Sequence, residues 1–133
     1  MILDAVTKIL ALTLWFECRG ESIEGKRFTA SVIWNRAAEP KGKYDLSWVV
    51  LRPRQFSCWN NRDTRNLTEP DRDFSEDKVW DDCVAIATEM VNGTFMPVTD
   101  ATHYFNPNKV MPEWADALRD VQDVGRHRFG RMK

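Results

Sequence analysis

Hydrophobic residues follow a helical spacing at the start of the chain. The side chains on one face of a predicted helix over residues 3–19 are Val6, Ile9, Leu10, Thr13, Leu14 and Glu17. Further apolar residues lie off this face, so the pattern predicts a central helix that is buried on more than one side. Gly20 is its expected C-cap.

Three more helices are predicted where apolar periodicity ends at a proline or a glycine. They cover residues 25–38 before Pro40, residues 46–52 after a capping Asp45, and residues 75–92 between a capping Ser75 and Gly93. Residues 53–74 are polar and irregular, and a long loop in a small protein is often functional.

The last third of the chain has a different pattern. "THYFN" (residues 102–106) and "GRHRF" (residues 125–129) are short, aromatic-rich and alternating, and they predict strands. Pro112 suits the first position of a helix between them. Together the elements predict an α+β fold, mainly helical with a small antiparallel strand element, in a single domain over residues 1–133.

Composition narrows the class of protein. The chain is 43% hydrophobic and has 19 basic against 20 acidic residues, which argues against disorder and against a protein built to bind nucleic acid. The apolar start contains Asp4 and Lys8 and lacks a cleavage site, so we expect neither a signal peptide nor membrane insertion.

The cysteines and histidines show no metal-ligand spacing. The chain has three cysteines and two histidines that lie far apart in sequence. We therefore expect reduced structural thiols, no metal and no cofactor, with one disulfide possible only outside the cytoplasm. We also expect a monomer.

Glu17 is the first candidate for chemistry. It follows Trp15 and Phe16 in a position where the helix pattern calls for a core residue, near the partly negative C-terminal end of the helix. Burial and the helix end both favour the protonated carboxyl, the form that a general acid for a glycosidic oxygen requires. The alternative is a structural ion pair with Arg19 or Arg36.

Other polar groups suit a saccharide site. Glu21 is a possible second carboxylate of a two-carboxylate glycosidase, whereas Glu24 is expected in a solvated turn. The loop "RQFSCWNN" offers Gln55, Ser57 and Trp59, whose amide, hydroxyl and indole suit the rims and faces of sugars. A loop with its Trp in the core is the commoner arrangement.

The strand at residues 102–106 separates its side chains onto two faces. His103 and Phe105 are predicted to share one face and Tyr104 to take the other. We expect Tyr104 to face a groove together with Asn106, Phe105 to be in the core and His103 to lie at the edge. The alternative is a core strand with one exposed polar residue. The basic C-terminal end is expected to be solvated.

Four stretches in this order resemble one family. "ALTLWFECRGESIEGKRFTASVIWNR" resembles the opening of the SleB-type cell wall hydrolases, the spore cortex-lytic class. "RQFSCW" is similar to the family's Q-F-S loop, "ATHYFNP" to its aromatic-Asn-Pro strand and "GRHRF" to its terminal G-x-H-x-F. Cys18 departs from the family pattern, which has alanine there.

The resemblance implies a lysozyme-like fold that acts on the peptidoglycan glycan strand. It implies cleavage between N-acetylmuramic acid and N-acetylglucosamine with Glu17 as catalytic acid. The expected groove around Glu17 is lined by Gln55, Ser57, Trp59, His103, Tyr104 and Asn106. No second carboxylate has the family's support, so a lytic transglycosylase is favoured over a hydrolytic muramidase.

The biological setting follows from what the chain lacks. Without an export signal or wall-binding repeats, it is expected to be a phage endolysin that is made in the host cytoplasm and acts on the wall after release. A short germination enzyme is the rival within the family. A non-catalytic glycan-binding module is the alternative from another class, and a metal-dependent amidase is disfavoured by the missing ligand set.

Overall fold

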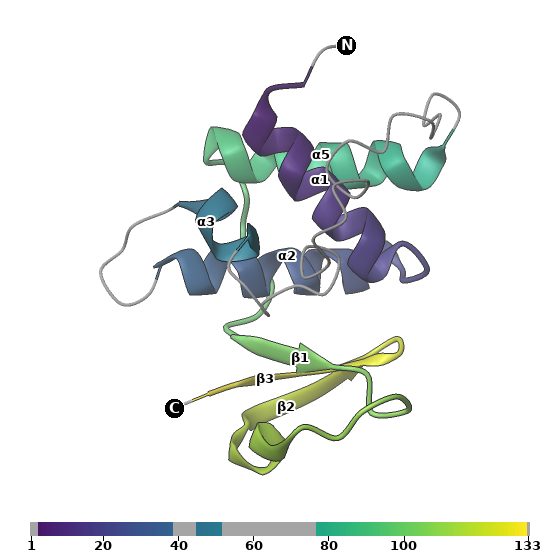
Figure 1. Cartoon of the computed structure of the whole chain (residues 1–133), viewed down its shortest axis with the longest axis vertical. Helices are drawn as coiled ribbons and strands as arrows, with labels where there is room; N and C mark the ends of the chain where they lie inside the picture. The colour runs from purple at the N-terminus through teal and green to yellow at the C-terminus, as the bar shows by residue number, and fades with distance from the viewer. Residues whose placement is uncertain (1–2, 39–44, 52–76, 133) are drawn as a thin grey trace. The chain divides into compact units, whose positions relative to one another are not determined.

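The computed structural model describes residues 3–38, 45–51 and 77–132 (Figure 1). The chain divides into two compact units. The helical unit comprises residues 1–19 and 45–95, and the sheet unit comprises residues 20–44 and 96–133. That residues 1–133 form a single domain stays a prediction.

The described part of the helical unit is built around its first helix. The helices are α1 (Ala5–Cys18), α3 (Leu46–Leu51) and α5 (Lys78–Asn92), and α1 packs against both of the others (Figure 1). Almost fully buried side chains from all three form the core: Leu10, Leu14, Val50, Cys83, Ile86 and Met90. The predicted central position of α1 within this unit is therefore confirmed.

Side-chain caps set the bounds of α1. The Asp4 carboxylate accepts a hydrogen bond from the Thr7 N–H at 2.8 Å, so the helix begins at Ala5 rather than at Leu3. The C-cap is Arg19 in a right-handed helical conformation. The prediction of a Gly20 C-cap was therefore wrong, because the chain leaves this helix without a left-handed residue.

The other two described helices of this unit also begin after an aspartate. Asp45 accepts a hydrogen bond from the Trp48 N–H, which confirms the predicted cap of α3. Asp77 caps α5 by accepting from the Trp80 N–H, whereas the predicted cap, Ser75, lies outside the described residues. Gly93 ends α5 at a φ of 83°, as predicted.

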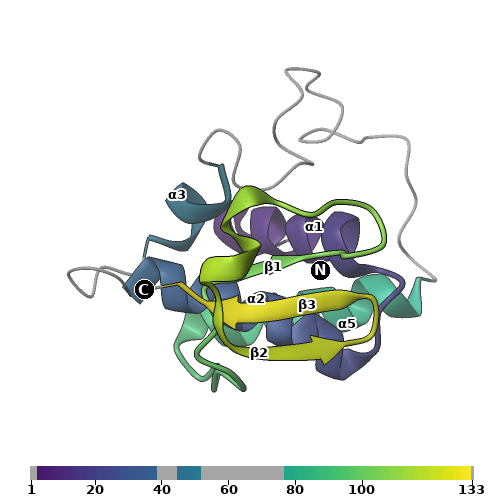
Figure 2. The same cartoon turned by 90° about the horizontal axis from the view of Figure 1, so that it is seen from below.

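The sheet unit combines one helix with three antiparallel strands. They are α2 (Ile23–Ala38), β1 (His103–Phe105), β2 (Arg119–Val124) and β3 (His127–Arg131), with β3 between the other two strands (Figure 2). α2 lies along the sheet and contacts β1 and β2. Four buried residues join helix and sheet into a core: Phe28, Val32, Ala101 and Phe129.

The end of α2 holds the segment that leads into β1. The Asn35 Nδ2 donates hydrogen bonds to the backbone carbonyls of Thr99 and Ala101 at 2.9 and 2.8 Å. The Arg36 Nε donates to the carbonyl of Thr102 at 2.6 Å. Asn35 and Arg36, the Asn-Arg pair of the family-like motif, therefore hold the backbone before β1 in place. Pro40, where the helix was predicted to stop, lies outside the described residues.

The strand β2 is the main element that the pattern did not predict. Pro112 precedes only a short 3-10 helix, η2 (Glu113–Ala117), and β2 follows at Arg119 where the predicted helix would have continued. Five of the six β2 residues are exposed, so the strand has no apolar face that could mark it in the sequence. Backbone pairing with β3 defines it.

Two of the three cysteines lie in the described part of the chain. Cys18 and Cys83 are both buried, and the Cys18 Sγ donates to the Leu14 carbonyl at 3.1 Å, while Cys58 lies outside the described residues. Among the described helices, none has the length and apolar character needed to cross a bilayer.

The β2–β3 turn gives a stability prediction at a glycine. Gly125 has a φ of 59°, and a Cβ there would lie 2.1 Å from the Glu21 Oε1. Gly93 has a φ of 83° but open space around it. Gly93→Ala should therefore lower the free energy of unfolding by about 1 kcal/mol, because only the backbone is strained. Gly125→Ala should lower it by about 2 kcal/mol more, because the new Cβ also displaces the buried Glu21 carboxylate.

Urea denaturation of both variants measures the two free energies of unfolding. Equal losses at the two glycines would contradict the steric contact with Glu21.

Candidate active site

Glu17 lies in the last turn of α1, in the helical unit. It is half-buried, so the expectation of a fully core-facing position was too strong. Its neighbour Trp15 is buried, meets the Phe16 ring edge-on at 5.1 Å and donates from Nε1 to Asp77 at 3.1 Å. The Arg19 guanidinium lies 4.3 Å from the centre of the Trp15 ring. Glu17 therefore follows an aromatic pair in the sequence and keeps part of its side chain exposed to solvent.

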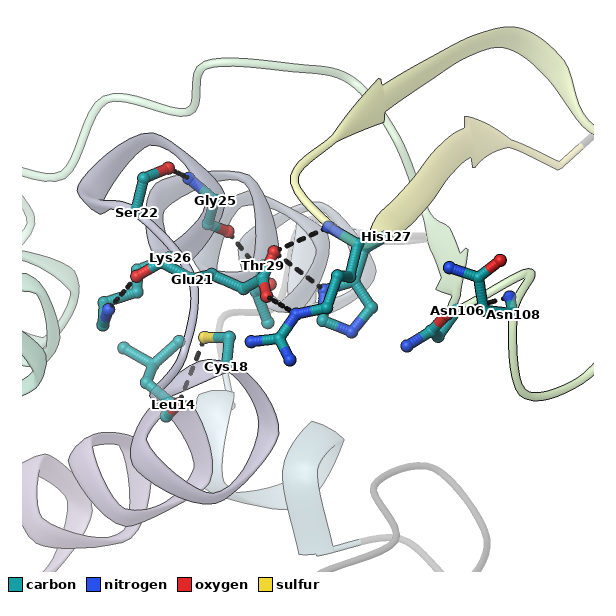
Figure 3. Close-up of polar contacts among 11 residues, drawn as sticks. Leu14, Cys18, Glu21, Ser22, Gly25, Lys26, Thr29, Asn106, Asn108 and His127 are labelled. Atoms are coloured by element: carbon teal, nitrogen blue, oxygen red, sulfur yellow. Dashed lines mark hydrogen bonds and ion pairs between the residues drawn. The ribbon is translucent and has the colours of Figure 1, made fainter.

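Glu21 is a buried carboxylate in the sheet unit. Only 4% of its side chain is exposed. Its Oε1 accepts a hydrogen bond from the Arg126 N–H and its Oε2 accepts one from the Arg126 Nε, both at 2.9 Å. Figure 3 shows this carboxylate turned toward His127, while the buried Lys26 ammonium donates to the Glu21 backbone carbonyl. Glu24, by contrast, is exposed, as expected, but it lies in the first turn of the helix α2 rather than in a connecting turn.

These contacts favour the ionised form of Glu21. Burial by itself raises the pKa of this carboxyl, but the hydrogen bonds from Arg126 and the charges of His127 and Arg126 outweigh burial and hold the pKa below the usual 4.5. A carboxylate held in this form is poorly suited to donate a proton at neutral pH. Its geometry is that of an anchor for the β2–β3 turn, and its role as second carboxylate stays a prediction.

His127 lies beside this carboxylate. Its Nδ1 is 3.8 Å from the Glu21 Oε1, and only 13% of its side chain is exposed. Its ring meets Tyr104 edge-on at 5.2 Å. The expectation that the basic C-terminal end is solvated was therefore wrong for His127. The alternation of His127 and Phe129 in the G-x-H-x-F stretch was the sequence signal that could have placed both side chains on the buried face of this strand.

Tyr104 lies on the face of β1 that packs on the core of the sheet unit. Its ring stacks on Phe129 with a centroid distance of 5.5 Å, opposite that residue in the strand register. Tyr104 is half-buried, whereas Phe105 is 6% exposed and belongs to the core, as predicted. That Tyr104 faces a substrate groove stays a prediction.

His103 lies on the opposite face of β1. Its ring meets Trp114 at 5.1 Å, and Phe105 meets the same indole at 5.6 Å, which confirms that these two side chains share a face. Burial, together with the charge of Arg36, lowers the pKa of His103 to about 4. His103 is therefore a neutral imidazole at neutral pH.

The remaining candidates are placed only in part. Asn106 follows β1, and its Oδ1 accepts a hydrogen bond from the Asn108 N–H at 2.9 Å, which orients its amide (Figure 3). Gln55, Ser57 and Trp59 lie outside the described residues. Within the described ranges, no group of three His, Cys, Asp or Glu side chains could hold a metal ion.

Comparison with known proteins identifies the family. A family model described as Cell Wall Hydrolase matches residues 20–130. The chain belongs to this family. The resemblance inferred from the four stretches is therefore confirmed, although Glu17 lies just before the matched segment, so the match does not bear on its role.

Curated relatives support the same family. The chain is 26% identical over 122 residues to the spore cortex-lytic enzyme of Bacillus subtilis (strain 168), covering 92% of this chain and 36% of the relative. It is 29% identical over 122 residues to that of Oceanobacillus iheyensis, covering 92% and 40%. The chain thus spans less than half the length of these relatives.

Solved structures share the fold. The catalytic domain of the germination-specific lytic transglycosylase SleB from Bacillus anthracis gives a TM-score of 0.69 at 22% identity, covering 98% of this chain and 97% of that one. The catalytic domain of the Bacillus cereus SleB protein gives 0.68 at 22% identity, covering 98% and 93%. The predicted lysozyme-like α+β fold is confirmed.

The buried carboxylate gives a second stability prediction. Glu21→Gln replaces an ionised acceptor by an amide whose NH₂ group faces the Arg126 donors, and it should lower the free energy of unfolding at neutral pH by about 3 kcal/mol. Glu24→Gln, at an exposed position in the first turn of α2, is the matched control and should change it by less than about 0.5 kcal/mol.

The pH dependence of this loss follows from the lowered pKa of Glu21. The folded-state pKa lies below the unfolded value, so the stabilisation is present above pH 4.5 and is lost as the pH falls through the folded-state pKa. The difference between wild type and Glu21→Gln should therefore shrink on acidification. A gap that persists well below pH 4.5 in denaturation curves would contradict the ionic contribution.

Proposed function

We propose that this chain cleaves the glycan strand of peptidoglycan between N-acetylmuramic acid and N-acetylglucosamine. The observation that carries the proposal is the Cell Wall Hydrolase match over residues 20–130. Two further findings support it: the curated relatives are named spore cortex-lytic enzymes, and the SleB domain of the same fold is named a lytic transglycosylase.

Glu17 serves as the general acid in this proposal. It is half-buried, so part of its side chain is shielded from water and part stays accessible. A general acid needs both a surrounding that favours its proton and contact with the leaving oxygen. Glu21 fits this role less well, because both of its oxygens accept hydrogen bonds from Arg126.

The reaction needs one protein carboxyl. Glu17 gives its proton to the glycosidic oxygen as the C1–O bond breaks, which leaves an oxocarbenium-like centre on the muramic sugar. The 6-hydroxyl of that sugar then bonds to C1, and its proton passes to the Glu17 carboxylate. The product carries a 1,6-anhydro end, whereas capture by water in a muramidase gives a hydrated reducing end.

Two settings fit this chemistry. We propose the role of a phage endolysin, made in the host cytoplasm and released to the wall, and the names of the relatives favour spore germination as the second candidate. The substrates differ, since an endolysin must cleave vegetative sacculi. Digestion of spore cortex fragments with vegetative sacculi left intact would favour germination.

The acid assignment predicts the effect of one substitution. Glu17→Gln keeps the size of the side chain but has no proton to donate, so it should lower the rate of sacculus cleavage by about 10²–10⁴-fold or more. Glu24→Gln is the control and should keep the wild-type rate. Turbidity loss of purified sacculi measures both, and a Glu17→Gln variant with near-normal clearing would remove Glu17 from the mechanism.

The reaction products show whether the 6-hydroxyl or water attacks C1 of the muramic sugar. Mass spectrometry of digested sacculi should find anhydro-muramic ends, each lighter by one water than the hydrated end. Hydrated reducing ends without anhydro ends would replace the transglycosylase by a muramidase. Intact glycan strands after prolonged digestion, together with retention of the protein on sacculi, would instead favour a non-catalytic glycan-binding module.

A further inference from the structure

The face of β1 opposite to Tyr104 carries an aromatic pair that the proposed mechanism does not use. His103 meets the Trp114 indole at 5.1 Å with the ring planes 61° apart. The same indole meets Phe105 at 5.6 Å, so two contacts from one strand fix its position. Trp114 and His103 are both half-buried, and each therefore keeps part of its surface accessible.

The Thr102 hydroxyl lies beside one ring nitrogen of His103. The Thr102 Oγ1 accepts a hydrogen bond from the Met132 N–H at 2.9 Å and lies 2.9 Å from the His103 Nδ1. The hydroxyl keeps one proton to donate, and the Nδ1 of a neutral imidazole can accept it. A neutral imidazole that accepts at Nδ1 carries its proton at Nε2.

The Nε2 side of the ring faces accessible space. Within the described part of the chain, the imidazole makes its hydrogen bond at Nδ1, and its Nε2 is not among the polar atoms that are buried without a partner. With Nδ1 as the acceptor, a neutral Nε2–H donor lies next to a flat apolar surface. Such a donor can bind an uncharged carbonyl oxygen and leaves no charge to be desolvated.

We propose that His103 and Trp114 form a binding pair for an acetamido sugar, in which the Nε2–H of His103 donates to the acetamido carbonyl oxygen and the Trp114 indole packs on the apolar face of the same ring. The inference rests on the proposed function, since that function supplies a polymer of acetamido sugars. Small-ligand sites commonly combine an apolar wall with a few fixed polar groups.

The alternative is that Trp114 only covers the sheet. Two substitutions of His103 separate the two roles, because the amide of asparagine reaches the place of Nδ1 and that of glutamine reaches the place of Nε2. His103→Asn should keep the Thr102 contact and lose the outward donor. His103→Gln should keep the outward donor. A purely structural role would give the two variants similar ligand affinities.

The experiment measures binding of chitotetraose to the full chain by calorimetry, in the Glu17→Gln background so that no turnover occurs. His103→Asn should weaken binding about 3–10-fold, and His103→Gln should stay near the reference affinity. Trp114→Phe should retain more affinity than Trp114→Leu. Cellotetraose, which lacks the acetamido group, should bind more weakly to the reference and respond little to His103→Asn.

Two readouts that do not depend on turnover accompany the titration. Thermal unfolding checks that each variant is folded, and ¹⁵N chemical shifts of the His103 ring should show the Nε2–H tautomer. An Nδ1–H tautomer, equal affinities for the Asn and Gln variants, or equal binding of chitotetraose and cellotetraose would each overturn the pair.

Sacculus cleavage by the wild-type chain separates this inference from the proposed function. Cleavage with no effect of His103→Asn on binding would overturn the pair and leave the enzyme assignment standing. If His103→Asn weakens chitotetraose binding and His103→Gln does not, but the wild-type chain cleaves no sacculi, the His103–Trp114 binding pair stands and the enzymatic assignment is overturned. If the chain neither binds chitotetraose nor cleaves sacculi, both are wrong.

Discussion

The buried carboxylate of Glu21 is the interaction on which the sheet unit depends. It lies just before α2 in the sequence, yet its two oxygens accept hydrogen bonds from Arg126, 105 residues later in the chain. A charge that is 4% exposed is stable only with such partners. The start of α2 and the β2–β3 turn are therefore held together by one side chain, and Gly125 lacks a Cβ where that side chain needs room.

The short strand β1 divides the aromatic residues of the sheet unit between two environments. Tyr104 stacks on Phe129 and meets His127, so its face is continuous with the core between α2 and the sheet. His103 and Phe105 point the other way and hold Trp114. The alternation of one three-residue strand thus puts Tyr104 on one face and His103 with Phe105 on the other, and of the latter two only His103 stays partly exposed.

The two units carry different parts of the proposed chemistry. The helical unit supplies Glu17, the half-buried carboxyl near the end of α1. The sheet unit supplies an ionised anchor at Glu21, a neutral imidazole at His103 and an oriented amide at Asn106. Glu17 is the proposed proton donor, whereas the proposed role of His103 needs an oriented ring N–H rather than a charge.

The sequence by itself determined the elements whose signals are local. Apolar spacing located α1, α2 and α5, and the terminal Gly93 and the capping Asp45 were also correct, because a helix and its caps depend on residues a few positions apart. The alternation in "THYFN" correctly separated Tyr104 from His103 and Phe105. The four family-like stretches were enough to identify the cell wall hydrolase family.

Only the tertiary structure decided the features that join distant residues. β2 is a polar strand that backbone pairing with β3 defines, and no periodicity marks it. The burial of Glu21 depends on Arg126, and the contact of His103 with Trp114 depends on how η2 packs on β1. Burial, ion pairing and ring contacts are properties of the folded surroundings. The residue type alone therefore does not tell whether a glutamate or a histidine is a structural anchor, a catalytic acid or a ligand-binding group.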